Sequence, residues 1–197
     1  MNLNDYLNPL DPSLIYEQSG EFLRNTRINR GGLQAKDLED VEIALVGVPF
    51  YFEERLKDST AADEIRRQLY PLAFDSRQGP VIADLGNMKR AENIRETLYG
   101  LSDVLTHLME KNIFVLLAGG DSLLNLAVLR SLPQITSDDL YYAMAEPYLS
   151  LAEYSGLDMV SDERIHLFQI GSQAHFNTQE QKVWTRSFVH ETYRLGK

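Results

Sequence analysis

Short apolar runs alternate with longer segments of helical period from residue 41 onward. Three of the five runs are almost continuously apolar, as expected for strands that are covered on both faces of a parallel sheet. The alternation indicates repeated β-α units, and it predicts a three-layer α-β-α sandwich with a mostly parallel sheet of about five strands. The predicted strands are Ile43–Val48, Pro80–Ala83, Ile113–Ala118, Leu140–Ala145 and Ile165–Ile170.

Four helices are predicted between and after these strands. The first begins near residue 60, where Thr60–Asp63 has the form of a capping box. The third covers Leu123–Leu132 and ends at Pro133, and the last covers Gln179–Leu195. The first helix should bury a face made of Ala61, Ile65, Leu69 and Leu72. The second has an apolar stripe made of Ile94, Leu98, Leu101, Leu105 and Leu108.

The first forty residues show little periodicity, so they are predicted as an N-terminal arm, residues 1–40, ahead of one α/β domain, residues 41–197. Arg24, Arg27 and Arg30 are spaced by three and would share a helix face. A solvated face is the simpler interpretation of this spacing, and an anion-binding stripe is the alternative.

Composition excludes several functions. With 19 basic and 29 acidic residues the net charge is 19 − 29 = −10, which disfavours nucleic acid and anionic membranes as partners. The absence of cysteine removes disulfides, thiolate metal sites and cysteine nucleophiles. The longest apolar run, Ile113–Ala118, is too short to span a membrane, and the N-terminus lacks signal-peptide features. A cytoplasmic protein is expected.

Ligands of parallel sheets bind at the carboxyl ends of the strands, so the residues there are the candidate site. Gly119–Gly120–Asp121–Ser122 could hold an anion at a helix start, or Asp121 and Ser122 could simply cap that helix. No phosphate-loop pattern is present. Phe50 and Tyr51 could line a ligand pocket or cover the end of the sheet. The histidines have no metal-ligand spacing.

Four segments, in order, resemble the ureohydrolase superfamily of arginase, agmatinase and formimidoylglutamase. They are Val46-Gly-Val-Pro-Phe, Ala61-Ala-Asp-Glu-Ile-Arg-Arg-Gln-Leu-Tyr, Asp84-Leu-Gly-Asn and the run Phe114–Leu129 that contains Gly-Gly-Asp-Ser. The resemblance covers roughly residues 41–175 and implies an arginase-like fold. It also implies C–N hydrolysis of guanidino or formimino groups by a two-manganese centre, if the metal ligands are kept.

The positions of those ligands depart from the family pattern. Ser122 replaces the histidine of Gly-Gly-Asp-His, while Met144, Glu146 and Tyr148 stand where Asp, His and Asp would be. The sequence ends before the third ligand motif, so the domain is expected to be incomplete relative to the family. Of the replacements only Glu146 suits a hard metal ion. We therefore expect no metal ligands and no cofactor, although the family uses manganese.

These departures predict a non-catalytic domain for binding or assembly. Its expected partner is a small guanidino or amino-acid-like ligand, or a second copy of the chain, since an incomplete sheet leaves an open edge. The alternatives are an active amidine or guanidine hydrolase that needs further residues, and a purely structural domain. Asp121 and Glu146 are the candidates for any remaining catalysis. The candidate ligand-binding residues are Gly119, Gly120, Asp121, Ser122, Glu146, Tyr148, Phe50 and Tyr51.

Overall fold

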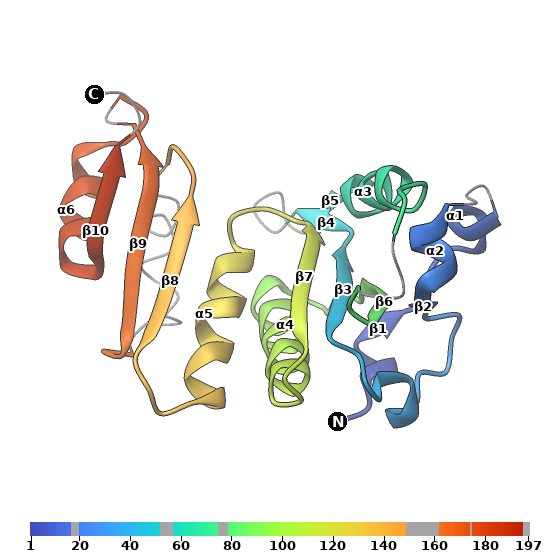
Figure 1. Cartoon of the computed structure of the whole chain (residues 1–197). Helices are drawn as coiled ribbons and strands as arrows, with labels where there is room; N and C mark the ends of the chain where they lie inside the picture. The colour runs from blue at the N-terminus through green and yellow to red at the C-terminus, as the bar shows by residue number, and fades with distance from the viewer. Residues whose placement is uncertain (17–19, 52–56, 75–78, 149–161, 174, 195–197) are drawn as a thin grey trace. The chain divides into compact units, whose positions relative to one another are not determined.

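The computed structural model describes residues 1–16, 20–51, 57–74, 79–148, 162–173 and 175–194 (Figure 1). The chain divides into two compact units, Met1–Asp121 and Ser122–Lys197. The first unit contains the 3-10 helices η1 (Leu3–Asp5) and η2 (Ala35–Leu38), the helices α1 (Pro12–Tyr16), α2 (Glu21–Asn25), α3 (Ala61–Leu69) and α4 (Ile94–Met109), and the strands β1 (Leu7–Asn8), β2 (Thr26–Ile28), β3 (Ile43–Val48), β4 (Phe50–Tyr51), β5 (Lys57–Asp58), β6 (Ile82–Met88) and β7 (Phe114–Gly119). The second contains α5 (Leu124–Ile135), β8 (Leu140–Ala145), β9 (Ile165–Ser172), α6 (Gln179–Phe188) and β10 (Val189–Arg194).

The main sheet of the first unit has five strands. Its order is β1-β6-β3-β7, and β2 also pairs with β6. The pairs β2–β6, β3–β6 and β3–β7 are parallel, whereas the short β1 is antiparallel to β6. The predicted α/β class with a mostly parallel sheet is confirmed, and three of the five predicted strands lie in this sheet.

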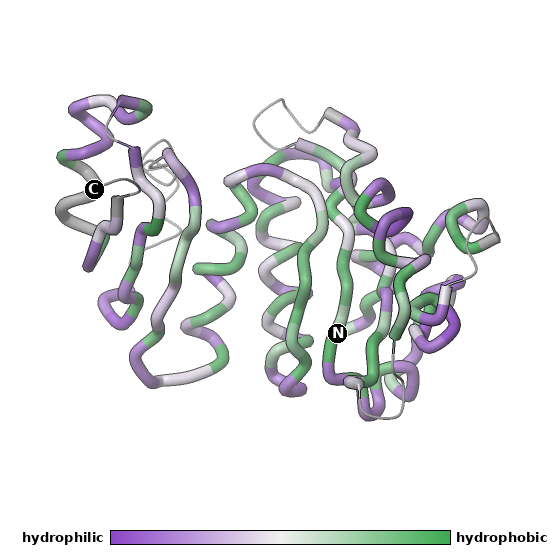
Figure 2. The backbone as a smooth tube through the Cα atoms, turned by 45° about the horizontal axis from the view of Figure 1, so that its top comes forward, coloured by the Kyte–Doolittle hydropathy of each residue, from purple (hydrophilic) through white to green (hydrophobic). Residues whose placement is uncertain are grey.

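Helices give the main sheet its core. Successive side chains of a strand point to opposite faces, and all of the residues from Ala44 to Val48 except Gly47 carry side chains that are buried, so β3 is covered on both faces. On one face Leu45 and Ala118 pack against Ala62 of α3. The long helix α4, predicted from its periodicity, buries Leu98, Leu101, Leu105 and Leu108. The strands at the centre of this sheet are the most hydrophobic stretches of the tube in Figure 2.

Helix α3 buries a different face from the predicted one. Ile65 and Leu72 are 44% and 52% exposed, whereas Ala62 and Arg66 are completely buried. Arg66 can be buried because it meets a carboxylate inside the unit, which outweighs the apolar pattern. Thr60 makes no side-chain cap, and Ser59 instead accepts a hydrogen bond from the Ala61 N–H at 3.2 Å.

The first forty residues form elements that join the main sheet. Strands β1 and β2 both pair with β6, and Leu10, Leu14 and Leu23 cluster around Tyr70. Helix α2 ends at Asn25, so the three arginines share no helix face: Arg24 lies in α2, Arg27 in β2 and Arg30 in the following loop. The idea of a helical arginine stripe is therefore wrong.

The second unit is built on a three-stranded parallel sheet in the order β10-β9-β8. Strands β8 and β9 match two predicted runs. The predicted last helix is too long, because α6 ends at Phe188 and Val189–Arg194 forms a strand; the predicted end at Leu195 lies outside the described residues. Pairing with β9 satisfies the backbone of this β-branched and aromatic segment, which outweighs its helical period.

Helix α5 continues through Pro133 to Ile135, so the predicted stop at that proline is wrong. Proline lacks an N–H, so the helix loses one hydrogen bond, to the carbonyl oxygen of Leu129, and it ends two residues after the proline. Arg164 donates to the free carbonyl oxygens of Pro133, at 3.3 Å, and Thr136, at 2.6 Å. None of the described helices is long and apolar enough to cross a bilayer.

Candidate functional site

The ends of β3 and β7 lie side by side at one edge of the main sheet, where Val48 pairs with Gly119. The residues that follow both strands therefore start from the same edge, as the sequence predicts for a site. Phe50 is only 2% exposed and belongs to the core, while Tyr51 is half-buried in β4. Asp121 is half-buried at the end of the first unit.

The two glycines after β7 have positive φ angles, +91° at Gly119 and +74° at Gly120. A Cβ atom on Gly119 would lie 2.6 Å from the carbonyl oxygen of Val48 and 3.2 Å from the backbone nitrogen of Ala62. Real Cβ atoms do not approach a carbonyl oxygen this closely, so only glycine lets β7 end against β3 and the start of α3. These contacts explain why residue 119 is a glycine, and the explanation requires no bound anion.

A buried ion pair fastens α3 to β6 near this edge. The side chains of Arg66 and Asp84 are both 0% exposed. Arg66 donates from Nε to Asp84 Oδ2 and from Nη2 to Asp84 Oδ1, both at 2.8 Å. This two-bond geometry is the strong form of an arginine–carboxylate pair.

The remaining donors of Arg66 are also used. Nη1 donates to Asn87 Oδ1 at 2.6 Å and to Asp63 Oδ1 at 3.2 Å, and Nη2 donates to the carbonyl oxygen of Gly86 at 3.0 Å. All five N–H bonds of the guanidinium thus meet an acceptor. Gly47 leaves space for this arrangement, since a Cβ there would lie 1.9 Å from Asn87 Oδ1 and 2.7 Å from Arg66 Nη1.

Asp84 is equally saturated. Its Oδ2 also accepts from the Tyr70 hydroxyl at 2.8 Å, and its Oδ1 from the Gly86 N–H at 3.0 Å. Burial opposes the charge of Arg66, but the hydrogen bonds and charge of Asp84 outweigh it and raise the pKa of the guanidinium. Burial, and then the charge of Asp84, raise the pKa of Tyr70. Because its donors and acceptors are all engaged, this network holds the fold together and leaves no group for acid–base chemistry.

The sequence carried a signal for this network. Arg66 lies in the Ile65–Arg66 part of one resembling segment, and Asp84 and Asn87 bound another. Those segments support the resemblance to the ureohydrolase superfamily, which by itself gives the arginine no physical role. Arg66 and Tyr70 are the residues that sequence reasoning missed in the first unit.

A second group of polar side chains surrounds the start of α5 in the second unit. The Tyr142 hydroxyl donates to Asn125 Oδ1 at 2.7 Å, and the Asn125 N–H donates to the carbonyl oxygen of Ser122 at 3.1 Å. Burial, and then the nearby charge of Glu146, raise the pKa of Tyr142 to about 12. The charge of Glu146 thus acts on the Tyr142 phenol, an effect that sequence reasoning did not identify.

The segment Glu146–Tyr148 is held rigidly after β8. Gln169 Nε2 donates to the carbonyl oxygens of Glu146, at 2.8 Å, and Tyr148, at 3.1 Å. Asn177 Nδ2 donates to the carbonyl oxygen of Pro147 at 3.0 Å. Tyr148 is 50% exposed, and its ring contacts that of Phe176 with centroids 5.3 Å apart. These bonds hold the backbone of the segment Glu146–Tyr148 to Gln169 and Asn177.

The raised pKa of Tyr142 gives an expected pH dependence. The unfolded chain ionises this tyrosine near pH 10, the folded chain only near pH 12. The stability that comes from keeping the phenol neutral should be complete below pH 10 and be lost as the pH rises from about 10 to about 12. In urea unfolding at pH 9, 10 and 11, the free energy of unfolding should fall less with rising pH in Tyr142→Phe than in the parent protein. Equal losses would place the phenol in a solvent-like environment and contradict the arrangement.

The residues of this sequence that align with metal-ligand positions of the ureohydrolase superfamily do not by themselves suit a pair of hard divalent cations. They supply the hydroxyl of Ser122, the thioether of Met144, the carboxylate of Glu146 and the phenol of Tyr148. Met144 is only 5% exposed. Two such cations need several carboxylates or imidazoles. Within the described parts of the chain, no group of three or more histidine, aspartate or glutamate side chains could hold a metal ion.

Comparisons with known proteins place the fold. No protein-family model matches the chain, and no curated protein matches it. Formiminoglutamase of Trypanosoma cruzi, crystallised with Mn²⁺, superposes with a TM-score of 0.70 at 12% identity, over 91% of this chain and 64% of that chain. Formimidoylglutamase of Bacillus subtilis gives a TM-score of 0.60 at 14% identity, over 85% and 63% of the two chains.

Agmatine ureohydrolase of Thermoplasma volcanium gives a TM-score of 0.61 at 20% identity, over 79% of this chain and 58% of that chain. The chain thus spans less than two thirds of the length of each of these three proteins. The family suggested by the four sequence segments agrees with these matches at the level of fold. The chain has a ureohydrolase-like, that is arginase-like, α/β fold.

Proposed function

We propose that this chain is an arginase-like domain without the dinuclear manganese site, and that it works by binding a ligand rather than by hydrolysing one. The observation that carries the proposal is the set of donors at the metal positions that this sequence covers, where Ser122, Met144, Glu146 and Tyr148 include one carboxylate and Met144 is buried. One carboxylate with neutral oxygen and sulfur donors does not hold two hard cations.

The site that remains is suited to a cationic nitrogen group. Glu146 is half-buried, its main-chain carbonyl oxygen accepts from Gln169, and its carboxylate supplies the negative charge of the site. Tyr142 stays protonated at neutral pH because its pKa is raised to about 12. A small guanidino or amino-acid-like molecule carries the positive, hydrogen-bonding nitrogen that such a carboxylate recognises. The ligand would be bound without an activated water.

Elemental analysis and thermal melting test the proposal together. Protein purified with added manganese should contain no stoichiometric metal, and its melting temperature should not change with Mn²⁺, since only a ligand bound to the native state stabilises it. L-Arginine and agmatine should instead raise the melting temperature. Glu146→Gln should weaken that binding by about tenfold to a hundredfold, the loss expected for a charged hydrogen bond.

Glu163→Gln is the matched control, because Glu163 is an exposed glutamate of the same unit. It should leave the ligand response unchanged. About two manganese ions per chain with a higher melting temperature would overturn the proposal and favour an active hydrolase. A ligand response that survives Glu146→Gln would remove Glu146 from the binding site.

A further inference from the structure

A cavity of about 250 Å³ lies beside β2 in the first unit, and none of the residues at the metal positions lines it. Its apolar lining comes from Ile28, Leu33, Ala83 and Leu85, and its charged residues are Arg27, Arg30 and Asp37. We propose that this cavity binds a small organic carboxylate with a short apolar chain. This inference does not depend on the proposed function.

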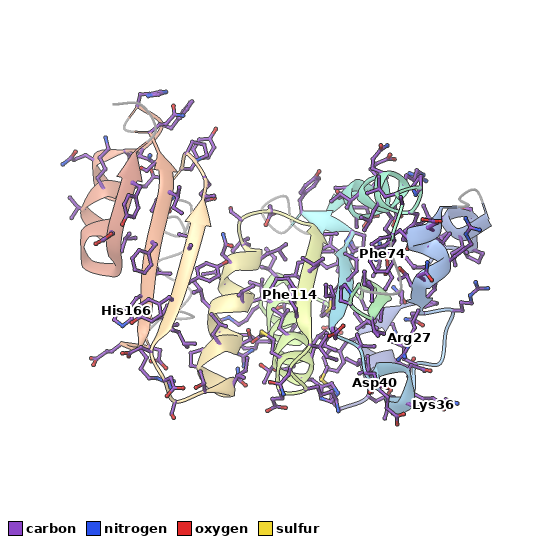
Figure 3. The ribbon with its side chains drawn as sticks, viewed as in Figure 1. Arg27, Lys36, Asp40, Phe74, Phe114 and His166 are labelled. Carbon is purple, nitrogen blue, oxygen red and sulfur yellow. The ribbon has the colours of Figure 1, made fainter. Side chains whose placement is uncertain are left out.

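The sheet register creates the cavity. Arg27 of β2 pairs with Ala83 of β6, so the two side chains lie next to each other on the same face of the sheet. A methyl group is the whole side chain of Ala83, and Leu85 continues that face two residues further along β6. The small residue leaves room beside the arginine stem, and it gives the cavity an apolar floor. Figure 3 labels Arg27 on this part of the unit.

The loop that carries Arg30 is held in place before any ligand arrives. Asn29 is only 4% exposed, and its N–H donates to the carbonyl oxygen of Asp84 at 2.9 Å. Its Nδ2 donates to the carbonyl oxygen of Leu85 at 2.8 Å, and its Oδ1 accepts from the Gly31 N–H at 2.9 Å. A loop fixed at three points has less entropy to lose on binding, which favours affinity for a small molecule.

The chain as a whole is acidic, with a net charge of −10, but the charged side chains that line this cavity favour an anion. Arg27 donates from Nη1 to the main-chain carbonyl oxygen of Glu39. This acceptor is neutral, so the bond does not neutralise the charge of the guanidinium. Arg30 is exposed, and no hydrogen bond or ion pair engages it within the described residues. Asp37 is occupied in the turn of η2, where its Oδ2 accepts from the Gln34 N–H at 2.7 Å. Two cations thus face one engaged carboxylate.

The size of the cavity limits the ligand. Sites for drug-sized molecules measure about 300–1,000 Å³, so the occupant here is smaller. A carboxylate fits the planar guanidinium group, and a short hydrocarbon chain fits Leu33 and Leu85. An inorganic anion would match only the arginines and leave the half-buried Ile28 and Leu33 without an apolar partner. The combination specifies a short-chain carboxylate.

Titration of ¹⁵N-labelled protein with acetate, butyrate and inorganic phosphate at constant ionic strength tests the proposal. Butyrate should shift the amide signals of Gly31, Leu33, Ala83 and Leu85. It should bind about tenfold more tightly than acetate, because two further methylene groups leave water. Equal affinities for acetate and butyrate, or a phosphate affinity equal to that of butyrate, would overturn the proposal.

Two variants locate the binding. Arg30→Gln should weaken butyrate binding by about tenfold, whereas Arg24→Gln, which changes an exposed arginine of α2 that does not line the cavity, should leave it unchanged. Ala83→Leu should fill the cavity and abolish binding, and the amide spectrum reports whether that variant is folded. Equal effects of Arg24→Gln and Arg30→Gln would show nonspecific charge attraction and sink the proposal.

Discussion

Replacement of Arg66 by alanine is expected to lower the free energy of unfolding by about 3–5 kcal/mol. The variant would leave the carboxylate of Asp84 buried without its cation, since both side chains are 0% exposed. It would also remove the donors that satisfy Asn87 Oδ1 and the Gly86 carbonyl oxygen. Urea unfolding followed by circular dichroism measures the change.

Arg67 is the matched control, because it is the next residue of the same helix. Its ion pair with Glu64 is 2.6 Å long, but the two side chains are 37% and 58% exposed. Arg67→Ala should cost no more than about 1 kcal/mol. A cost for Arg66→Ala as small as that for Arg67→Ala would contradict the buried network.

A double variant separates charge from packing. Arg66→Met keeps much of the side-chain volume but still leaves Asp84 unpaired, so it should remain strongly destabilising. Combining Arg66→Met with Asp84→Asn removes the buried negative charge. The double variant should therefore be more stable than the sum of the single losses predicts, by about 2 kcal/mol or more. Strict additivity would mean that the pair contributes only through packing.

The same helix shows what the sequence can and cannot predict. Periodicity predicts that α3 exists and begins near residue 60, which is confirmed. It fails on the buried face, because it treats arginine as polar and isoleucine as apolar, whereas Ile65 is 44% exposed and Arg66 is buried. A buried arginine depends on a carboxylate eighteen residues away in β6, and no local pattern contains that contact.

A strand can be predicted from the sequence where its residues form a continuous apolar run. β3 is buried along both faces, so its composition alone indicates a central strand. β10 carries charged and polar residues and follows α6 without a loop, so its pattern resembles a helix continuation. Its pairing with β9 is a long-range contact that propensity does not encode. The short strands β1 and β2 escaped prediction in the same way.

At the candidate site, the sequence predicts which residues follow the strands but not the contacts that those residues make. The Gly119–Asp121 turn and the Glu146 segment follow strands as expected, but β7 and β8 are not covered on both faces, since Phe114, Leu116 and Tyr141 are 64%, 44% and 72% exposed. The partners that define their behaviour, Tyr142 and Gln169, lie inside strands and carry no motif. Their roles depend on which face of a strand meets the turn, and that follows from the three-dimensional pairing.

Replacement of Gly119 by alanine is expected to lower the free energy of unfolding by about 2–4 kcal/mol. Two costs contribute. The φ angle of +91° is strained for any residue with a Cβ atom, and that atom would lie 2.6 Å from the carbonyl oxygen of Val48. The obstacle is backbone on both sides, in β3 and at the start of α3, so it cannot rotate away.

Gly31→Ala isolates the first of these costs. Gly31 has a φ angle of +108°, but a Cβ atom there would meet nothing within 4 Å. This control should therefore lose only about 1–2 kcal/mol, the cost of the left-handed conformation. The excess for Gly119→Ala measures the close approach of β7 to β3 and α3. If both variants lose the same amount, the turn can open to accept a side chain, and the Gly119–Gly120 pair then needs a reason other than packing, such as a bound anion at the start of α5.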